Sequence, residues 1–346
     1  MERANARRFV SVYIFSPLVD HALIIWAPVL FLVVGAAVGL SGLGERTTTF
    51  GGHEQPLVVA LATAFTLAHI VAVFFRTHGN REIFRLYPFR FGVVPVAVLL
   101  GAWVSEAVWV LLAVVIVWMD VWHSSMQTFG FGRIYDKRAG NDALVGRRLD
   151  MGMALLTYAG PILAGAALAE HLVRLSWLER VGVSAATDLG IFALRHQPEV
   201  ARVLVATGTA YTIYYIASYV RLARRGYRVP LQKLLLYVAL TFTSIWTWGF
   251  DSFGQAYLIM ESFHALQYFP MVWTSERKNL RERLGLPSSP RGSTLAFLAF
   301  VVPCAAFGVW SAFFATTDAA IAVCFVAEGL HYWYDGFIWS VRRNQV

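Results

Sequence analysis

The feature that most constrains the fold of this chain is a series of long apolar segments that recurs along its whole length. Runs such as ALIIWAPVLFLVVGAAVGL approach the length that an α-helix needs to cross a bilayer core about 30 Å thick. Charged residues make up 14% of the chain, whereas soluble domains usually contain about a quarter. We therefore expect an all-α protein, a polytopic bundle of transmembrane helices.

About ten segments are expected to span the membrane. A single stretch contains the third and fourth of them, and we expect a hairpin turn near Ser105, because one continuous helix would put the basic loops 76–90 and 130–149 on opposite sides. With this turn both termini are cytoplasmic, and 24 of the 29 Lys and Arg lie on the cytoplasmic side, as the positive-inside rule predicts. The expected spans are 17–42, 56–75, 91–104, 106–129, 150–173, 199–222, 231–250, 254–273, 294–315 and 319–340.

No low-complexity linker divides the chain, so residues 1–346 are expected to form a single integral-membrane helical domain. The first apolar run follows the basic start MERANARR but is too long for a signal peptide, and we expect it to be retained. The net charge of +8 is spread over short loops, which argues against a nucleic-acid partner and for a bacterial inner (plasma) membrane protein. Arg133, Tyr135 and Lys137 are interpreted as ordinary inner-loop residues.

Three of the apolar segments repeat one pattern of polar residues. An acid is followed by a histidine three residues later and by another polar residue four residues after that, in DVWHSSMQ, ESFHALQY and EGLHYWYD. This i, i+3, i+7 spacing places the three side chains on one face of a helix. Ionisable residues in apolar spans are costly and usually face the bundle interior, so each is a functional candidate. The residues are Asp120, His123 and Gln127; Glu261, His264 and Tyr268; Glu328, His331 and Asp335.

The Glu-x-x-His spacing is typical of helical bundles that bind metal ions, as in di-iron carboxylate proteins. The carboxylate offsets the charge of the metal, and the imidazole supplies a nitrogen ligand. On the ten-span topology, five histidines on five separate spans fall in the cytoplasmic half of the membrane. They are His21, His69, His123, His264 and His331. The pattern therefore predicts a buried metal centre in that half.

The predicted centre combines these histidines with nearby carboxylates. The expected cofactor is iron, as one or two ions. Glu261, Glu328 and Asp335 are also predicted to be catalytic, and Gln127 and Tyr268 are predicted to orient the imidazoles. The predicted metal ligands are His21, His69, Asp120, His123, Glu261, His264, Glu328, His331 and Asp335.

A polytopic membrane protein with histidines in the inner half of its spans resembles the histidine-rich integral-membrane non-haem iron oxygenases. That group includes fatty-acid desaturases and hydroxylases and the Brp/Blh-type carotenoid dioxygenases. The carotenoid-cleaving branch is nearer in layout, because the five histidines here are likewise spread over many hydrophobic helices, and the chain lacks the desaturase boxes His-x-x-x-His and His-x-x-His-His. The resemblance implies oxygenation, desaturation or oxidative cleavage of a membrane lipid or other lipophilic molecule, with O2 and an electron donor.

Two other classes of function remain open from the sequence. A haem-binding electron-transfer protein would use pairs of the same histidines as axial ligands. A proton-coupled transporter would use the buried acids and histidines as a proton relay. For a single histidine, a hydrogen bond to a neighbouring helix is the simpler interpretation, and Asp20 next to His21 has the position of an interfacial cap.

Overall fold

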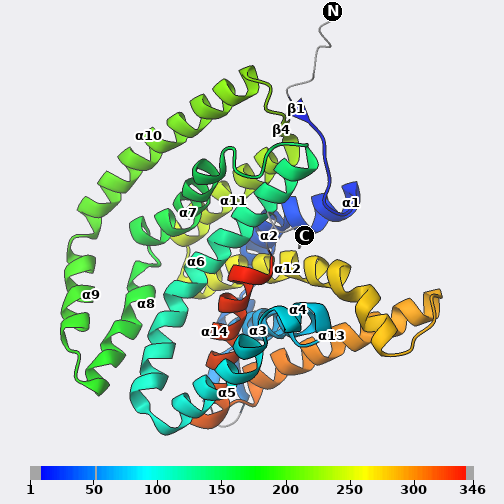
Figure 1. Ribbon diagram of the computed structural model, residues 1–346. Helices are drawn as coiled ribbons and strands as arrows, with labels where there is room; N and C mark the ends of the chain where they lie inside the picture. Colours follow the sequence, from blue (N-terminus) through cyan, green and yellow to red (C-terminus); the bar gives the residue numbers. More distant parts are fainter. Residues whose placement is uncertain (1–8, 51–52, 340–346) are drawn as a thin grey trace, which may run out of the picture.

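The computed structural model describes residues 9–50 and 53–339, and this part of the chain is almost entirely helical (Figure 1). Two short strand pairs accompany the helices: β1 (Phe9–Val10) runs parallel to β4 (Val229–Pro230), and β2 (Thr47–Phe50) runs antiparallel to β3 (His53–Pro56). The basic start of the chain and residue 340, the last of the expected C-terminal span, lie outside the described residues. The helices are α1 (Pro17–Val19), η1 (Asp20–Ile25), α2 (Ala27–Leu40), η2 (Leu43–Glu45), α3 (Leu57–Thr77), α4 (Arg81–Leu86), α5 (Pro88–Val104), α6 (Glu106–Arg138), α7 (Arg147–Ala164), α8 (Leu168–Val173), η3 (Arg174–Val181), α9 (Ala185–Arg195), α10 (Gln197–Arg224), α11 (Leu231–Phe250), α12 (Phe253–Arg283), α13 (Pro290–Phe313) and α14 (Asp318–Ile338).

Within the described ranges, four helices are long and apolar enough to cross a membrane: α3, α6, α10 and α13. Two bent pairs of helices meet the same standard when each pair is taken together, which raises the count to six. The helices α11, α12 and α14 do not meet this standard. The prediction of an all-α protein is therefore confirmed, several of its helices are long and apolar enough to span a membrane, and the count of ten spans remains a prediction.

The break between α5 and α6 falls where the loop charges predict it. Ser105 is extended (φ −131°, ψ 112°), and its hydroxyl accepts a hydrogen bond from the backbone N–H of Val108, which caps the start of α6. At its other end α6 continues to Arg138. Arg133 and Tyr135 are therefore buried helical residues, and their interpretation as inner-loop residues was wrong.

The segment expected as one span over 150–173 is instead bent by 88° between α7 and α8. At the bend Gly165 is extended, and a Cβ atom there would come within 2.5 Å of the Cα atom of Gly249. The N–H groups of Ala166 and Ala167 donate to the carbonyl oxygens of Gly249 and Trp248. The helix ends here because these two N–H groups bond to carbonyl oxygens at the end of α11 instead of to carbonyl oxygens of α7.

The centre of the bundle is formed by α3, α6, α12 and α14. Helix α3 packs against α12, α13 and α14, and α14 also contacts α5 and α6. Helices α7, α11 and α10 follow on the other side of α6, with α9 and α10 at the outer edge (Figure 1). The four central helices carry the candidate site.

Candidate metal centre

Four histidines from four helices meet inside the bundle: His69 of α3, His123 of α6, His264 of α12 and His331 of α14. One ring nitrogen of each lies within 4.8 Å of those of the other three. All four side chains are at most 5% exposed. The predicted convergence of histidines from separate helices is confirmed for these four residues, which we call the histidine cluster.

The ring nitrogens of the histidine cluster face one another. His123 Nε2 lies 3.1 Å from His264 Nε2 and 3.2 Å from His331 Nε2. A neutral ring nitrogen carries either a proton or a lone pair, so His123 Nε2 can satisfy only one of these two neighbours with a hydrogen bond. His69 points Nδ1 at the carbonyl oxygen of Thr66, and its Nε2 has no hydrogen-bond partner among the described residues. At least two ring nitrogens of the cluster therefore lack a matched hydrogen-bond partner.

The donor set fits a metal ion. Two nitrogens that are each about 2.1 Å from one ion lie about 3.0–3.4 Å apart at octahedral or tetrahedral angles. The Nε2 separations of 3.1 and 3.2 Å around His123 fall in this range. Neutral imidazole is a common ligand for iron, zinc, copper and nickel. The His69 Nδ1 contact with a backbone carbonyl is the interaction that typically orients a metal-binding imidazole.

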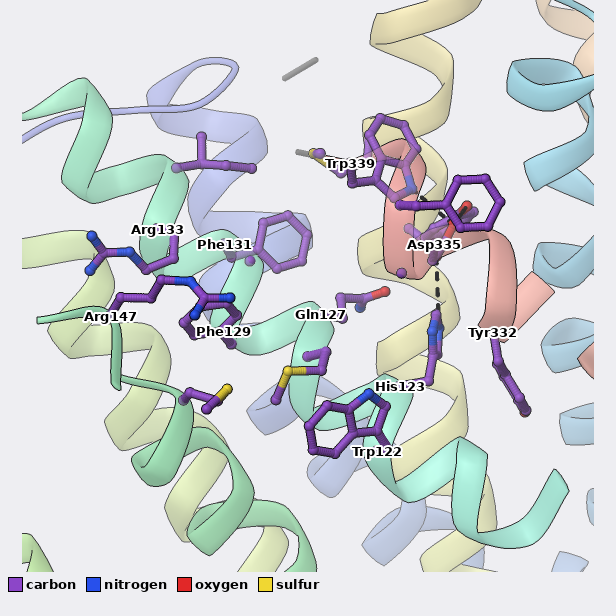
Figure 2. Close-up of a pocket in the computed structure, with 18 of the residues that line it drawn as sticks. Trp122, His123, Gln127, Phe129, Phe131, Arg133, Arg147, Tyr332, Asp335 and Trp339 are labelled. Atoms are coloured by element: carbon purple, nitrogen blue, oxygen red, sulfur yellow. Dashed lines mark hydrogen bonds and ion pairs between the residues drawn. The ribbon is translucent and has the colours of Figure 1, made fainter. Parts of the chain in front are cut away.

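Asp335 lies beside the histidine cluster. Its Oδ2 is 3.9 Å from His123 Nε2 and 3.8 Å from His331 Nε2. Its Oδ1 accepts hydrogen bonds from the hydroxyl of Tyr268, at 2.8 Å, and from Trp339 Nε1, at 2.9 Å. One carboxylate oxygen is therefore held by neutral donors while the other faces the ring nitrogens (Figure 2).

Tyr268 and Gln127 occupy positions that support the cluster. The ring of Tyr268 packs edge-on against His331 (centroids 4.8 Å apart) and His69 (5.6 Å). Gln127 Nε2 donates to the backbone carbonyl of His264, at 3.1 Å, and to Gln267 Oε1, at 3.0 Å. Tyr268 therefore contacts two imidazoles directly, whereas Gln127 acts on the backbone that carries His264.

The acids that precede three of the histidines form a separate layer. Asp120, Glu261 and Glu328 each lie three residues before a histidine, which is a rise of about 4.5 Å along a helix. None of the three belongs to the set of mutually close ligand atoms, which consists of the four histidines. Glu261 accepts a hydrogen bond from the hydroxyl of Tyr158, at 3.5 Å. We call these three residues the carboxylate layer.

Hydroxyl groups surround the carboxylate layer. Tyr332 donates to Glu328 Oε1 at 2.9 Å, and Ser124 donates to Asp120 Oδ1 at 3.4 Å. The ring of Tyr332 also packs against His123, with centroids 4.8 Å apart. Tyr332 therefore links the carboxylate layer to the histidine cluster.

The structure does not bring His21 to the centre. Its ring packs edge-on against Tyr13, with centroids 5.9 Å apart. The neighbouring Asp20 is buried and accepts hydrogen bonds from the hydroxyl of Tyr135 and from three backbone N–H groups, those of Ile14, Phe15 and Ser16. The hydrogen bond between Asp20 and Tyr135 therefore attaches the N-terminal segment to α6.

A cavity of about 620 Å³ reaches the histidine cluster from one side. His123 and Asp335 lie at one end and Arg133 and Arg147 lie at the other (Figure 2). Aromatic residues and methionines make up most of the wall between them, among them Trp122, Met126, Phe129, Phe131 and Met271. The cavity can therefore hold an apolar molecule against His123.

A second buried polar group, which the sequence did not reveal, lies further along α6. Arg133 Nη1 is 2.7 Å from Asp136 Oδ2 and 2.6 Å from Asp150 Oδ2. Lys233 Nζ is 2.8 Å and 2.7 Å from the same two oxygens. We call these four residues the ionic cluster. In the sequence, Lys233 and Asp150 lie at the edges of apolar segments. Charged residues are common there, because helix ends are solvated and cytoplasmic loops are basic, so this position gave no specific signal.

A scan of family models, a search of curated proteins and a search of solved structures each gave no match. Function is therefore inferred from the geometry of the site. Of the predicted site residues, the structure places four histidines in one cluster, with Asp335 and Tyr268 against it and Gln127 on the backbone of His264. It places Asp120, Glu261 and Glu328 in the adjoining layer, and His21 elsewhere.

Proposed function

We propose that the protein is a membrane-embedded, metal-dependent oxidoreductase in which His69, His123, His264 and His331 hold iron. Its substrate is a lipophilic molecule from the bilayer that occupies the cavity beside His123 and Asp335. Iron bound by these imidazoles would supply one-electron and O2 chemistry. This is the activity class of the histidine-rich membrane oxygenases, which the chain resembles in the spread of its histidines over several helices.

One observation carries the proposal: His123 Nε2 lies within 3.2 Å of two other Nε2 atoms inside a buried cluster. Neutral imidazoles facing one another in this way leave lone pairs opposed, and a buried polar atom without a partner is costly. A single cation bound among the rings would remove both problems, because each nitrogen that contacts it would donate its lone pair to it. The apolar wall of the cavity supports a lipophilic substrate over a water-soluble one.

The residues around the cluster have distinct tasks in this proposal. Asp335 Oδ2, close to both His123 and His331, is the acceptor for a proton released at the cavity end of the site, and Tyr268 and Trp339 hold its other oxygen in place. Tyr332 connects the carboxylate layer to the cluster, because its hydroxyl donates to Glu328 and its ring packs against His123.

The geometry supports one ion at the histidine cluster. A second ion, as in a di-iron centre, would need Asp120, Glu261 and Glu328 as ligands, about one helical turn away along the axes. The ratio of iron to protein in purified material separates the two forms. A ratio near one with unchanged iron in Glu261→Gln supports the single ion, and a ratio near two that drops in Glu261→Gln supports the pair.

A haem protein is less compatible with this arrangement. The axial ligands of a haem lie on opposite faces of a flat macrocycle. Here the Nε2 atoms of His264 and His331 lie 3.1 and 3.2 Å from that of His123, which leaves no room for a flat macrocycle between them. The ring of His69 packs edge-on against those of His264 and His331. The carboxylate layer keeps proton translocation as a second candidate function, since buried acids linked by hydroxyl groups are typical of proton relays.

We further propose the ten-span topology, with both termini cytoplasmic and the site in the cytoplasmic half of a bacterial inner membrane. Each of the ten apolar segments overlaps a helix or a bent pair of helices, and the Lys and Arg residues favour one side. Cysteine labelling of single-cysteine variants from the two sides of the membrane, at Arg138 and Arg180 for example, tests this arrangement. Arg138 should react only from the cytoplasmic side and Arg180 only from the other.

The proposed function is tested by metal analysis of the purified wild type beside His264→Ala and His331→Ala. Iron should copurify with the wild type and be absent from both variants. The matched control is His171→Ala, because His171 is also a buried histidine but lies outside the histidine cluster. Iron-free wild-type protein with full oxidoreductase activity would overturn the proposal, and a Soret band would favour the haem alternative.

A further inference from the structure

A second cavity, of about 570 Å³, lies between the start of α7 and the end of α10 and is lined by four arginines. Arg147 and Arg148 come from the first turn of α7, and Arg221 and Arg225 come from the end of α10. The hydroxyl of Ser218 lies between them and accepts a hydrogen bond from Arg221 Nη2 at 3.4 Å. We call this site the arginine pocket.

The arginine pocket lacks internal counter-charge. Among residues 9–50 and 53–339, none of its four guanidinium groups forms an ion pair with Asp or Glu. All four arginine side chains are exposed, so their charges are open to a partner from the surroundings. Four like charges around one hollow repel one another, and a polyvalent anion relieves this repulsion. The planar guanidinium fork is suited to phosphate in particular.

The start of α7 adds to the positive potential. The helix begins after Gly146, which has φ 72° and provides no side-chain cap for the first N–H groups. A side chain at this position would also collide with Tyr219, whose hydroxyl lies 2.5 Å from where a Cβ would be. Uncapped N–H groups at a helix start favour a phosphate. The arginines and the helix start therefore act on the same anion.

The arginine pocket joins the cavity that leads to the histidine cluster. Leu144 and Arg147 line both. The longer cavity follows α6 from Arg133 to His123, a helix rise of about 15 Å, which is half of a bilayer core about 30 Å thick. The two cavities together therefore match one leaflet, from the headgroup level to the middle of the hydrocarbon.

We infer that the arginine pocket binds the phosphate headgroup of a membrane lipid whose acyl chain lies along the cavity with its far end at His123. This inference rests on the proposed function and narrows its substrate to a phosphate-bearing lipid. The headgroup would fix how far along the chain the reaction occurs, because α7, which carries part of the pocket, packs against α6, which carries His123. On the ten-span topology the pocket lies on the cytoplasmic side, at headgroup depth.

The headgroup site is tested by the binding of dioleoyl phosphatidic acid to full-length protein in detergent, measured by native mass spectrometry. The variant is Arg147→Gln with Arg221→Gln, and the matched control is Arg224→Gln with Arg277→Gln, which removes two exposed arginines outside the pocket. We expect at least tenfold weaker binding in the first and unchanged binding in the second. Equal binding by both variants would overturn the inference.

Two competitors identify what the pocket recognises. Dioleoylglycerol has the same chains without phosphate, and its binding should not differ between the wild type and the Arg147→Gln, Arg221→Gln variant. Inorganic phosphate should displace the lipid only at concentrations far above that of the lipid. Displacement at equal concentration would mean a site for free phosphate and would overturn the lipid assignment.

The position of the chain is tested with a phosphatidic acid that carries a diazirine near the end of one acyl chain. After irradiation, the label should be found on the α6 residues of the cavity wall, between Trp122 and Phe131. Label confined to the outer surface of α10 would overturn the inference. The same binding and labelling are repeated with His264→Ala, which should keep both. If lipid binding is intact but activity does not depend on iron, only the proposed function is rejected. If activity depends on iron but the lipid does not bind in the pocket, only the lipid assignment is rejected.

Discussion

Helix α6 carries parts of two buried polar clusters that differ in one respect. The ionic cluster contains two cations and two anions, so its charges cancel within the protein. The histidine cluster contains four groups of the same kind, and its close contacts are between ring nitrogens. A cluster whose charges cancel can be purely structural, whereas a cluster of like groups with unmatched nitrogens needs a bound partner such as a metal ion. That difference separates the anchor of the fold from the candidate site.

The largest expected effect is on the balanced cluster. Lys233→Met leaves Asp136 and Asp150 with Arg133 as their one remaining cation, and breaking a buried ion pair in this way costs about 3–5 kcal/mol. Thermal unfolding in detergent should show a marked loss of stability, with unchanged iron per folded protein. Adding Asp150→Asn should recover part of the loss, because it restores the balance of charge. No destabilisation by Lys233→Met would contradict the anchoring role.

The second effect is on the unbalanced cluster. His123→Ala removes the imidazole that contacts two others, and iron affinity should decrease at least about 100-fold, since even partners of metal ligands contribute about 10–100-fold. The iron-free variant should unfold at nearly the temperature of the iron-free wild type. A large stability loss without any change in metal affinity would show that the cluster is structural after all.

Adding metal should stabilise only variants in which the histidine cluster is intact. Ferrous iron at about 100 times its dissociation constant should stabilise the wild type by about 2.7 kcal/mol, because it binds the folded state. The variant Lys233→Met should gain the same increment from its lower starting point, and His264→Ala should gain none. Unfolding curves with and without iron, under anaerobic conditions, give all three values.

Asp335 is the carboxylate that lies against the histidine cluster. Asp335→Asn keeps an acceptor for Tyr268 but removes the negative charge near His123 and His331, so turnover should decrease about 10–100-fold with a small effect on folding. Iron content and initial rate measured on the same preparation separate a loss of metal from a loss of proton transfer. An unchanged rate would exclude Asp335 from the site.

The smallest effect is expected for an ion pair on the surface. Arg202 and Glu199 are 3.0 Å apart with side chains 76% and 60% exposed. Arg202→Gln should change the free energy of unfolding by at most about 1 kcal/mol. A loss comparable with that of Lys233→Met would remove the distinction between buried and exposed charges.

The apolar segments predicted the helices well because burial in lipid leaves a simple composition signal. The turn at Ser105 also followed from loop charge, since it depends on a bias that acts along the whole chain. The bend at Gly165 could not be predicted, because it depends on the close approach of Gly249, a residue from another helix. The ionic cluster was missed for the same reason: its members come from three helices that no local pattern connects.

The site itself was predicted in part. The i, i+3 spacing correctly placed acids and histidines on shared helix faces, and it identified the three motif-bearing helices that meet at the cluster. It could not show that a rise of about 4.5 Å separates the two kinds of residue into layers. His69 was found from depth alone, and His21, at the same expected depth, lies apart, because depth does not fix which helices are neighbours.

The four-helix origin of the histidine cluster has a consequence for biogenesis. His69 is supplied early in synthesis, whereas His331 and Asp335 arrive on α14, the last helix of the described chain. The cluster is therefore incomplete until α14 has been synthesised and has packed against the other three helices. A ribosome-bound or truncated chain that ends before α14 would lack one of the four histidines, so the complete cluster requires helices from distant parts of the chain to have assembled.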